Sequence, residues 1–310
     1  MSEAKRTFTK KAASFDEQIH LLKSRGLSIQ NEEQTKFYLK NIGYYRLSAY
    51  ELPFQRGDRS EAHHQFLPGT TFEQVLELYT FDRKLRLLVM DAMERIEIAI
   101  KSIVINEMCI PYQAHWYMDR THFVNGFDHE GFIKSIHKDI DHGKNSENVR
   151  NISIRHYYEN YDAPSMPPLW MVFEALTFGT VSLIYGWLPH VDQKRIADQF
   201  NLGVPILKSW LQAASYTRNL CAHHARLWNR VYTKKPKEMM EYKGEFTPNT
   251  KFYAQACMLH IFMQRISPES HWANRLSTLL SEHPNIAKEH MGFPADWEAH
   301  PLWATQKSKQ

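Results

Sequence analysis

The segment from Phe72 to about Glu107 contains neither glycine nor proline, and no other feature of the sequence restricts the fold as much. It spans about 36 residues, and apolar side chains occur on every side of it when it is drawn as a helix. A helix that is apolar all round must be buried by other elements. Because strand patterns are scarce in the rest of the chain, we expect an all-α protein in which this helix forms the spine.

Capping residues and glycines mark the beginnings and ends of shorter helices before and after the long helix. Helices are expected over 16–25 and 32–41, which Gly26 and Gly43 end, followed by a compact aromatic segment at 44–50 and a polar loop at 55–70. Later helices are expected near 129–142, 146–160, 169–188 (interrupted by Gly179), 192–200, 206–232, 250–265 and 271–281. The pattern predicts three parts: an N-terminal helical region (1–68), a helical core (69–235) and a C-terminal helical extension (236–310).

Composition and charge exclude several classes of protein. With 310 residues that are 43% hydrophobic, the chain can bury a core and is not disordered. The formal net charge of +4 is mildly basic and permits a polyanionic partner. No apolar run reaches the length of a membrane span, and the polar, basic N-terminus lacks a signal-peptide core, so we expect a cytoplasmic protein without a membrane partner.

The 17 histidines suggest the hypothesis of a metal site. No His-Glu-x-x-His or His-x-His pattern occurs, and adjacent pairs such as His63-His64 cannot both face one ion from a regular helix. The densest ligand set is formed by His137, Asp139, Asp141 and His142. The three cysteines are widely spaced and indicate neither a disulfide framework nor a structural zinc site. We therefore expect no metal and no cofactor.

One polar segment stands out within the predicted helix 206–232. Asn219 and His223 are four residues apart and share a helix face, which Arg226 and Arg230 are expected to continue. Arg218 lies about 140° around the helix from His223. Guanidinium groups bind phosphate oxygens, and imidazole exchanges protons near neutral pH, which together are the requirements of metal-free RNA cleavage. A plain polar helix face with a satisfied histidine is the alternative.

The six residues from Arg218 to His223 match the Arg-(Asn/Asp/His)-x3-His signature of the HEPN superfamily, whose active members are metal-independent endoribonucleases. The wider chain resembles the bacterial Abi family of AbiD/AbiF-like abortive-infection proteins. The resemblance is carried by blocks in one order, at 15–27, 42–50, 78–86, 93–98, 168–170, 173–179 and 218–230. It implies a HEPN-like helical bundle over 69–235 with N- and C-terminal helical extensions.

The resemblance also implies a function. It predicts a phage-defence toxin, an endoribonuclease that uses the RNA 2′-hydroxyl as nucleophile, with Arg218, Asn219 and His223 as catalytic residues. Family members usually pair two copies, which implies a homodimer with a composite active site facing one groove. A toxin of this kind implies an antagonist, either a small structured RNA or a protein. The alternative is a non-catalytic RNA-binding or adaptor protein of the same fold.

Further residues are candidates for binding RNA or for supporting the site. A charged stripe on the long helix offers Arg83 and Arg86 as RNA contacts and Glu94 and Glu97 as supporting residues, although ion pairing within the stripe fits equally well. In the block at 42–50, base stacking and simple packing are both open, and packing is the more common. The RNA-binding candidates outside the stripe are Tyr45, Arg46, His224, Arg226 and Arg230.

Overall fold

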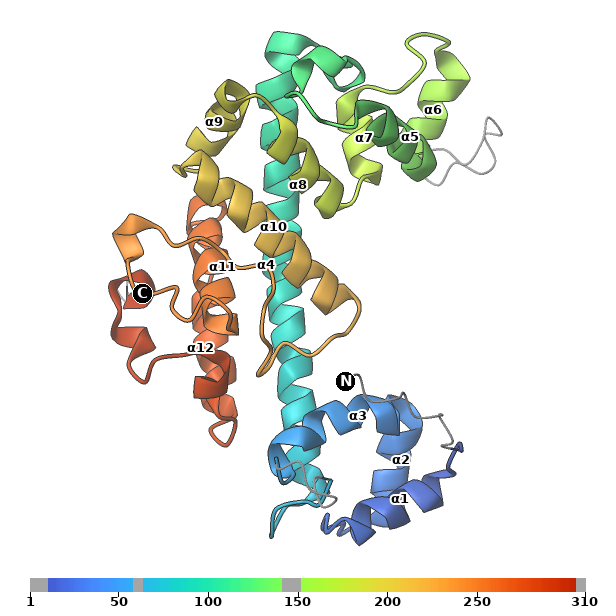
Figure 1. Ribbon diagram of the computed structural model, residues 1–310, viewed down its shortest axis with the longest axis vertical. Coiled ribbons are helices and arrows are strands. Elements are labelled where there is room, and N and C mark those ends of the chain that lie inside the picture. Colours follow the sequence, from blue (N-terminus) through green and yellow to red (C-terminus); the bar gives the residue numbers. More distant parts are fainter. Residues whose placement is uncertain (1–10, 58–63, 141–151, 305–310) are drawn as a thin grey trace, which may run out of the picture. The chain divides into compact units, whose positions relative to one another are not determined.

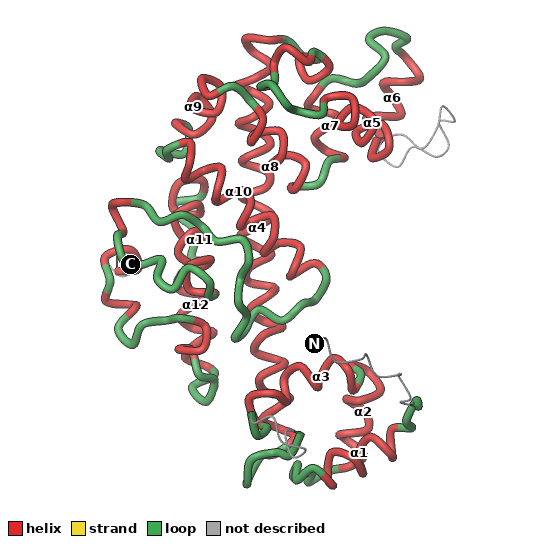
Figure 2. The backbone as a smooth tube through the Cα atoms, in the orientation of Figure 1, coloured by secondary structure: helices red, strands yellow, loops and turns green. Residues whose placement is uncertain are grey.

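The computed structural model describes residues 11–57, 64–140 and 152–304, and in these residues the chain is all-α (Figure 2). The described residues form thirteen α-helices joined by loops and short 3₁₀ turns, and they contain no strand longer than an isolated bridge. The predicted fold class is therefore confirmed. Among the described helices, none combines the length and the apolar character that crossing a membrane requires.

The chain divides into two compact units, residues 1–84 and 85–310. Helix α4 (Phe72–Tyr112) begins in the first unit and continues through the second. Its 41 residues make it about 60 Å long, and the predicted helix over 72–107 is confirmed. Thr71 begins it, since the Gln74 backbone N–H donates to the Thr71 hydroxyl and the Gln74 side chain accepts from the Thr71 N–H. The three-part division at 68 and 235 stays a prediction.

The first unit contains three short helices before α4: α1 (Phe15–Ser24), α2 (Glu32–Ile42) and α3 (Tyr44–Glu51). The predicted helices over 16–25 and 32–41 are confirmed, with Ser14 and Asn31 as their N-caps. Helix α2 packs against both α1 and α3. The buried Tyr50 hydroxyl donates to the Asp82 carboxylate at 2.7 Å, which joins α3 to the first turns of α4.

The second unit is built around the rest of α4 (Figure 1). Helix α10 (Val204–Ala222) packs against α8 (Phe178–Trp187), α9 (His190–Asp198) and α11 (Phe252–Ile266). The buried Trp272 indole N–H donates to the Leu88 carbonyl at 2.8 Å and joins α12 to α4. The remaining helices are α5 (His129–Ile140), α6 (Ile152–Asn160), α7 (Leu169–Ala175), α12 (Trp272–Glu282) and α13 (Pro301–Ala304).

The helix predicted over 169–188 is two helices, and the break is not at Gly179. Helix α7 ends at Ala175, and the Thr177 hydroxyl accepts a hydrogen bond from the Thr180 backbone N–H, which makes Thr177 the N-cap of α8. Gly179 lies inside the first turn of α8, where a side chain would press against the Ser215 hydroxyl of α10. The glycine therefore permits close packing of α8 on α10 and does not end a helix.

Candidate functional site

Helix α10 ends at Ala222, so the prediction that it continues to about 232 is wrong. His223 is its C-cap, and His224 adopts a left-handed conformation with φ 56°. The His224 N–H donates to the Cys221 carbonyl and the Ala225 N–H to the Leu220 carbonyl, which is the hydrogen-bond pattern of a Schellman ending. Arg226 and Arg230 therefore do not continue the helix face of Asn219 and His223.

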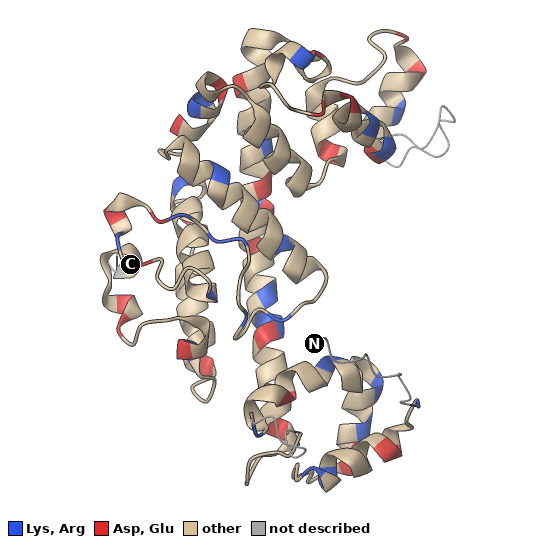
Figure 3. Cartoon of the chain, viewed as in Figure 1, with Lys and Arg blue, Asp and Glu red and all other residues tan. Residues whose placement is uncertain are grey.

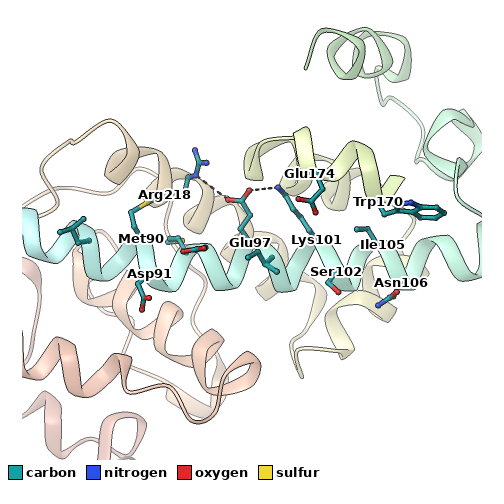
Figure 4. A pocket seen from close by; sticks show the side chains of 14 residues that line it. Met90, Asp91, Glu97, Lys101, Ser102, Ile105, Asn106, Trp170, Glu174 and Arg218 are labelled. Carbon is teal, nitrogen blue, oxygen red and sulfur yellow. Dashed lines mark ion pairs between the residues drawn. The ribbon is translucent and has the colours of Figure 1, made fainter. Parts of the chain in front are cut away.

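Arg218 and Asn219 contact each other near the end of α10, since Arg218 Nη1 donates to Asn219 Oδ1 at 3.3 Å. His223 is exposed, and it makes no side-chain hydrogen bond or ion pair within the described residues. Arg218 is half-buried, and its Nε lies 3.8 Å from the Glu97 carboxylate of α4. Glu97 also accepts from Lys101 Nζ at 2.9 Å, so this carboxylate lies between two cations (Figure 4). Glu97, a candidate supporting residue from the sequence, therefore lies beside the signature arginine, and its supporting role stays a prediction.

Arg218 lines a groove of about 770 Å³ along α4 and α7, which we call the carboxylate groove. Its charged lining consists of four carboxylates, from Asp91, Glu94, Glu97 and Glu174, and two cations, from Lys101 and Arg218. Acidic and basic side chains are interspersed along α4 (Figure 3). The excess of carboxylates disfavours an RNA strand that follows the length of this groove.

Asn219 lines a second groove, of about 640 Å³, which we call the lysine groove. Its charged lining consists of Lys208 and Lys234 alone, and its uncharged part includes Ser182, Leu183, Trp187, Gln212, Ser215 and Tyr216. Residues 208, 212, 215, 216 and 219 follow the helical spacing i, i+4, i+7, i+8 and i+11 and therefore form one face of α10. Two cations beside an indole and a phenol ring are suited to a single-stranded polyanion.

A set of hydrogen bonds holds the Lys234 segment beside α10. The buried Thr217 hydroxyl donates to the Gln255 side chain at 3.1 Å, and Gln255 donates in turn to the Lys234 carbonyl at 3.1 Å. Farther along α10, the Trp210 indole N–H donates to the Lys237 carbonyl at 2.7 Å. This basic loop after α10 is blue in Figure 3. No sequence pattern predicts the groove, because its two lysines meet only in the tertiary structure.

Arg230 reaches the edge of the lysine groove through Tyr216. Burial raises the pKa of the Tyr216 phenol, but hydrogen bonds with Thr233 and Arg230, together with the positive charge of Arg230, outweigh burial and lower it. The Arg230 guanidinium also donates to the Arg226 carbonyl at 3.1 Å. Arg230 therefore contacts the groove lining from the segment after α10, not from a continued helix.

The other predicted RNA contacts differ in their surroundings. Arg83 is exposed, whereas Arg86 is only 6% exposed and so cannot offer its guanidinium to a large polyanion. Neither arginine lines a groove described above. Tyr45 is 91% exposed on α3, beside the exposed Arg46, so simple packing, the favoured of the two alternatives for this block, does not hold for Tyr45. Glu94 is exposed in the carboxylate groove, and His224 is exposed beside His223.

The part of the chain that the structure describes contains no group of three or more histidine, cysteine or carboxylate side chains placed to hold a metal ion. Of the densest ligand set in the sequence, Asp141 and His142 lie outside the described residues, as does His63. None of the three cysteines forms a disulfide within the described residues, and Cys221 and Cys257 are buried.

Comparison with protein families gives one match, to the model described as Abi-like protein, over residues 37–229. This range is more than half of the chain. The protein belongs to the Abi-like family. In this Abi-like protein the matched range contains α4, α10 and both grooves apart from Lys234. Neither the curated proteins nor the solved structures contain a match. Membership of the family points to a role in abortive infection.

Proposed function

We propose that this Abi-like protein is an abortive-infection endoribonuclease that cleaves RNA without a metal ion, with His223 and Arg218 as catalytic residues. One observation carries the proposal: the signature lies at the exposed end of α10, and its Asn219 lines a groove whose charged side chains are all lysines. An exposed imidazole next to such a groove is suited to a backbone that carries one negative charge per nucleotide.

The chemistry uses the 2′-hydroxyl of the RNA as nucleophile. The 2′ oxygen loses its proton and attacks the adjacent phosphorus, the bond from phosphorus to the 5′ oxygen breaks, and that oxygen takes up a proton. The products are a 2′,3′-cyclic phosphate and a 5′-hydroxyl. His223 exchanges one of the two protons, and Arg218 neutralises charge that develops on the phosphate.

Arg218 and His223 work best in this scheme when they come from two copies of the chain. Within one copy Arg218 faces Glu97 and lines the carboxylate groove, whereas His223 lines neither groove. A homodimer with a composite site supplies the arginine of one copy to the histidine of the other. The contact with Glu97 orients the Arg218 guanidinium before RNA binds.

The test is cleavage of labelled RNA in excess EDTA by the wild type and by His223→Ala. The matched control is His190→Ala, since His190 is also an exposed histidine at a helix end of the second unit. We expect His223→Ala to slow cleavage by about 10²–10⁴-fold and His190→Ala to leave it unchanged. Equal activity of the wild type and His223→Ala contradicts the site. Binding of RNA by the wild type without cleavage favours the adaptor function instead.

Control of such an enzyme is part of the proposal. A ribonuclease that acts on the RNA of its own cell requires an antagonist, either a small structured RNA or a protein. Sequencing of nucleic acid that co-purifies with the protein tests the first kind, and preparations free of nucleic acid contradict a tightly bound RNA antagonist.

A further inference from the structure

We propose that the carboxylate groove is the docking site for a basic amphipathic helix of a partner protein. The groove runs along α4 from Leu87 to Asn106, and α7 and Arg218 of α10 complete it (Figure 4). Nineteen residue steps of helix correspond to about 28 Å. A site of this length matches a helix of about five turns.

Two of the four carboxylates of the groove have no ion-pair partner within the described residues. Lys101 and Arg218 both lie against Glu97, and Asp91 contacts Arg95 and Arg275. Glu94 and Glu174 are exposed and make no ion pair or hydrogen bond within the described residues. The chain as a whole carries a formal charge of +4, so this groove is a local exception. Two uncompensated carboxylates select a cationic occupant.

The groove also exposes apolar side chains. Leu87 is 58% exposed, Ile98 is 60% exposed, and Trp170 of α7 is 45% exposed. Leu87, Met90, Glu94, Ile98 and Lys101 recur at steps of three or four and form one face of α4. An amphipathic helix that lays an apolar stripe on these side chains and turns lysines or arginines toward the carboxylates satisfies both features.

Charge also decides between this occupant and two others. An RNA strand that lies along the groove brings phosphates toward Glu94 and Glu174, which is repulsive. A second copy that pairs through the same surface around a two-fold axis brings these carboxylates of both copies into one interface, which is also repulsive. A basic helix gains attraction at both residues. Such an occupant also contacts Glu97, the residue against which Arg218 lies.

The test uses a fluorescein-labelled synthetic peptide of about 18 residues, with leucine on one helical face and lysine on the other. Two control peptides carry glutamate in place of lysine, or the same residues in an order without an apolar stripe. Fluorescence anisotropy with the full chain measures the Kd. We expect the first peptide to bind, and both control peptides to bind with a Kd at least tenfold higher. No binding of the first peptide, or equal binding of all three, overturns the proposal.

Variants locate the binding. Glu94→Lys/Glu174→Lys is expected to raise the Kd of the lysine peptide by at least tenfold, and Ile98→Ser is expected to raise it by about threefold to tenfold. The matched control is Glu159→Lys/Glu269→Lys, which reverses two exposed glutamates elsewhere in the same unit and is expected to change Kd less than twofold. All four glutamates are exposed, so the folded state tolerates their substitution, which circular dichroism checks. Equal Kd for both double variants overturns the proposal.

Light scattering measures the oligomeric state of the same proteins and so tests whether a second copy of the chain occupies the groove. A wild type that is dimeric and a Glu94→Lys/Glu174→Lys variant that is monomeric assign the groove to a second copy and overturn the proposal. The peptide measurement needs no ribonuclease activity. Its failure is therefore distinguishable from a failure of the proposed function, which the cleavage assay of His223→Ala tests separately.

Discussion

Removal of the two lysines from the lysine groove tests whether RNA follows it. Lys208→Gln/Lys234→Gln removes both charges of the groove lining and keeps a polar, unbranched side chain at each position. For a single strand, each lost phosphate contact reduces the magnitude of the slope of log K against log salt by about 0.7, so the slope of the double variant should be shallower by about 1.4. Its affinity deficit should therefore shrink about sevenfold between about 50 and 200 mM salt.

The assay measures binding of a labelled, unstructured RNA of about 20 nucleotides by anisotropy over that salt range. The His223→Ala background keeps the RNA intact. The control is Lys138→Gln/Lys243→Gln, which removes two exposed lysines of the second unit that line neither groove. We expect the control to keep the slope of the parent.

Two results refute this reasoning. An unchanged slope in Lys208→Gln/Lys234→Gln means that these lysines contact no phosphate. An equal loss of slope in both double variants means that binding follows the net charge of the chain and not the groove.

Three further predictions concern assembly and stability. A mixture of inactive Arg218→Ala and His223→Ala chains should regain about a quarter of wild-type cleavage, since half of randomly paired dimers carry one intact composite site; no recovery contradicts a shared site. Burial raises the pKa of the Glu51 carboxyl to about 7. The protonated carboxyl therefore contributes stability to the first unit that is fully present below about pH 4.5 and is lost as the pH rises through 7. Glu51→Gln should therefore stabilise α1–α3 by up to about 3 kcal/mol at pH 8 and little at pH 4, as measured by hydrogen exchange corrected for its intrinsic pH dependence; equal gains at both pH values contradict the shifted pKa. Thr217→Val leaves the buried Gln255 side chain without its donor and should lower the free energy of unfolding by about 1–3 kcal/mol, measured in denaturant by tryptophan fluorescence. Thr278→Val, at an exposed threonine, should lower it little. Equal losses for both variants argue against the Thr217–Gln255 contact.

Local signals were enough to predict most helices. The spine was predictable because nothing between Phe72 and Glu107 interrupts a helix, and Ser14 and Asn31 form the N-caps that their side chains predict. The end of α10 was missed because His224 takes the left-handed position that glycine usually occupies. Histidine is enriched in that conformation among non-glycine residues, but the signal is weak in a single sequence.

The candidate site was predictable only in its local part. Arg218, Asn219 and His223 were found because they are close in sequence. The lysine groove was missed because Lys208 and Lys234 are brought together by hydrogen bonds from α10 and α11 to the loop after α10. The burial of Arg86 and the exposure of Tyr45 depend on tertiary packing in the same way, and residue type alone predicts neither.

The central claim is that RNA is cleaved by its own 2′-hydroxyl, with His223 exchanging a proton and no metal ion taking part. Mass spectrometry of the ends of RNA cleaved in excess EDTA tests it most directly. The predicted products carry a 2′,3′-cyclic phosphate and a 5′-hydroxyl, and they form about 10²–10⁴-fold more slowly when His223→Ala replaces the wild type. Products with a 3′-hydroxyl and a 5′-phosphate, formed only when a divalent ion is restored, contradict it.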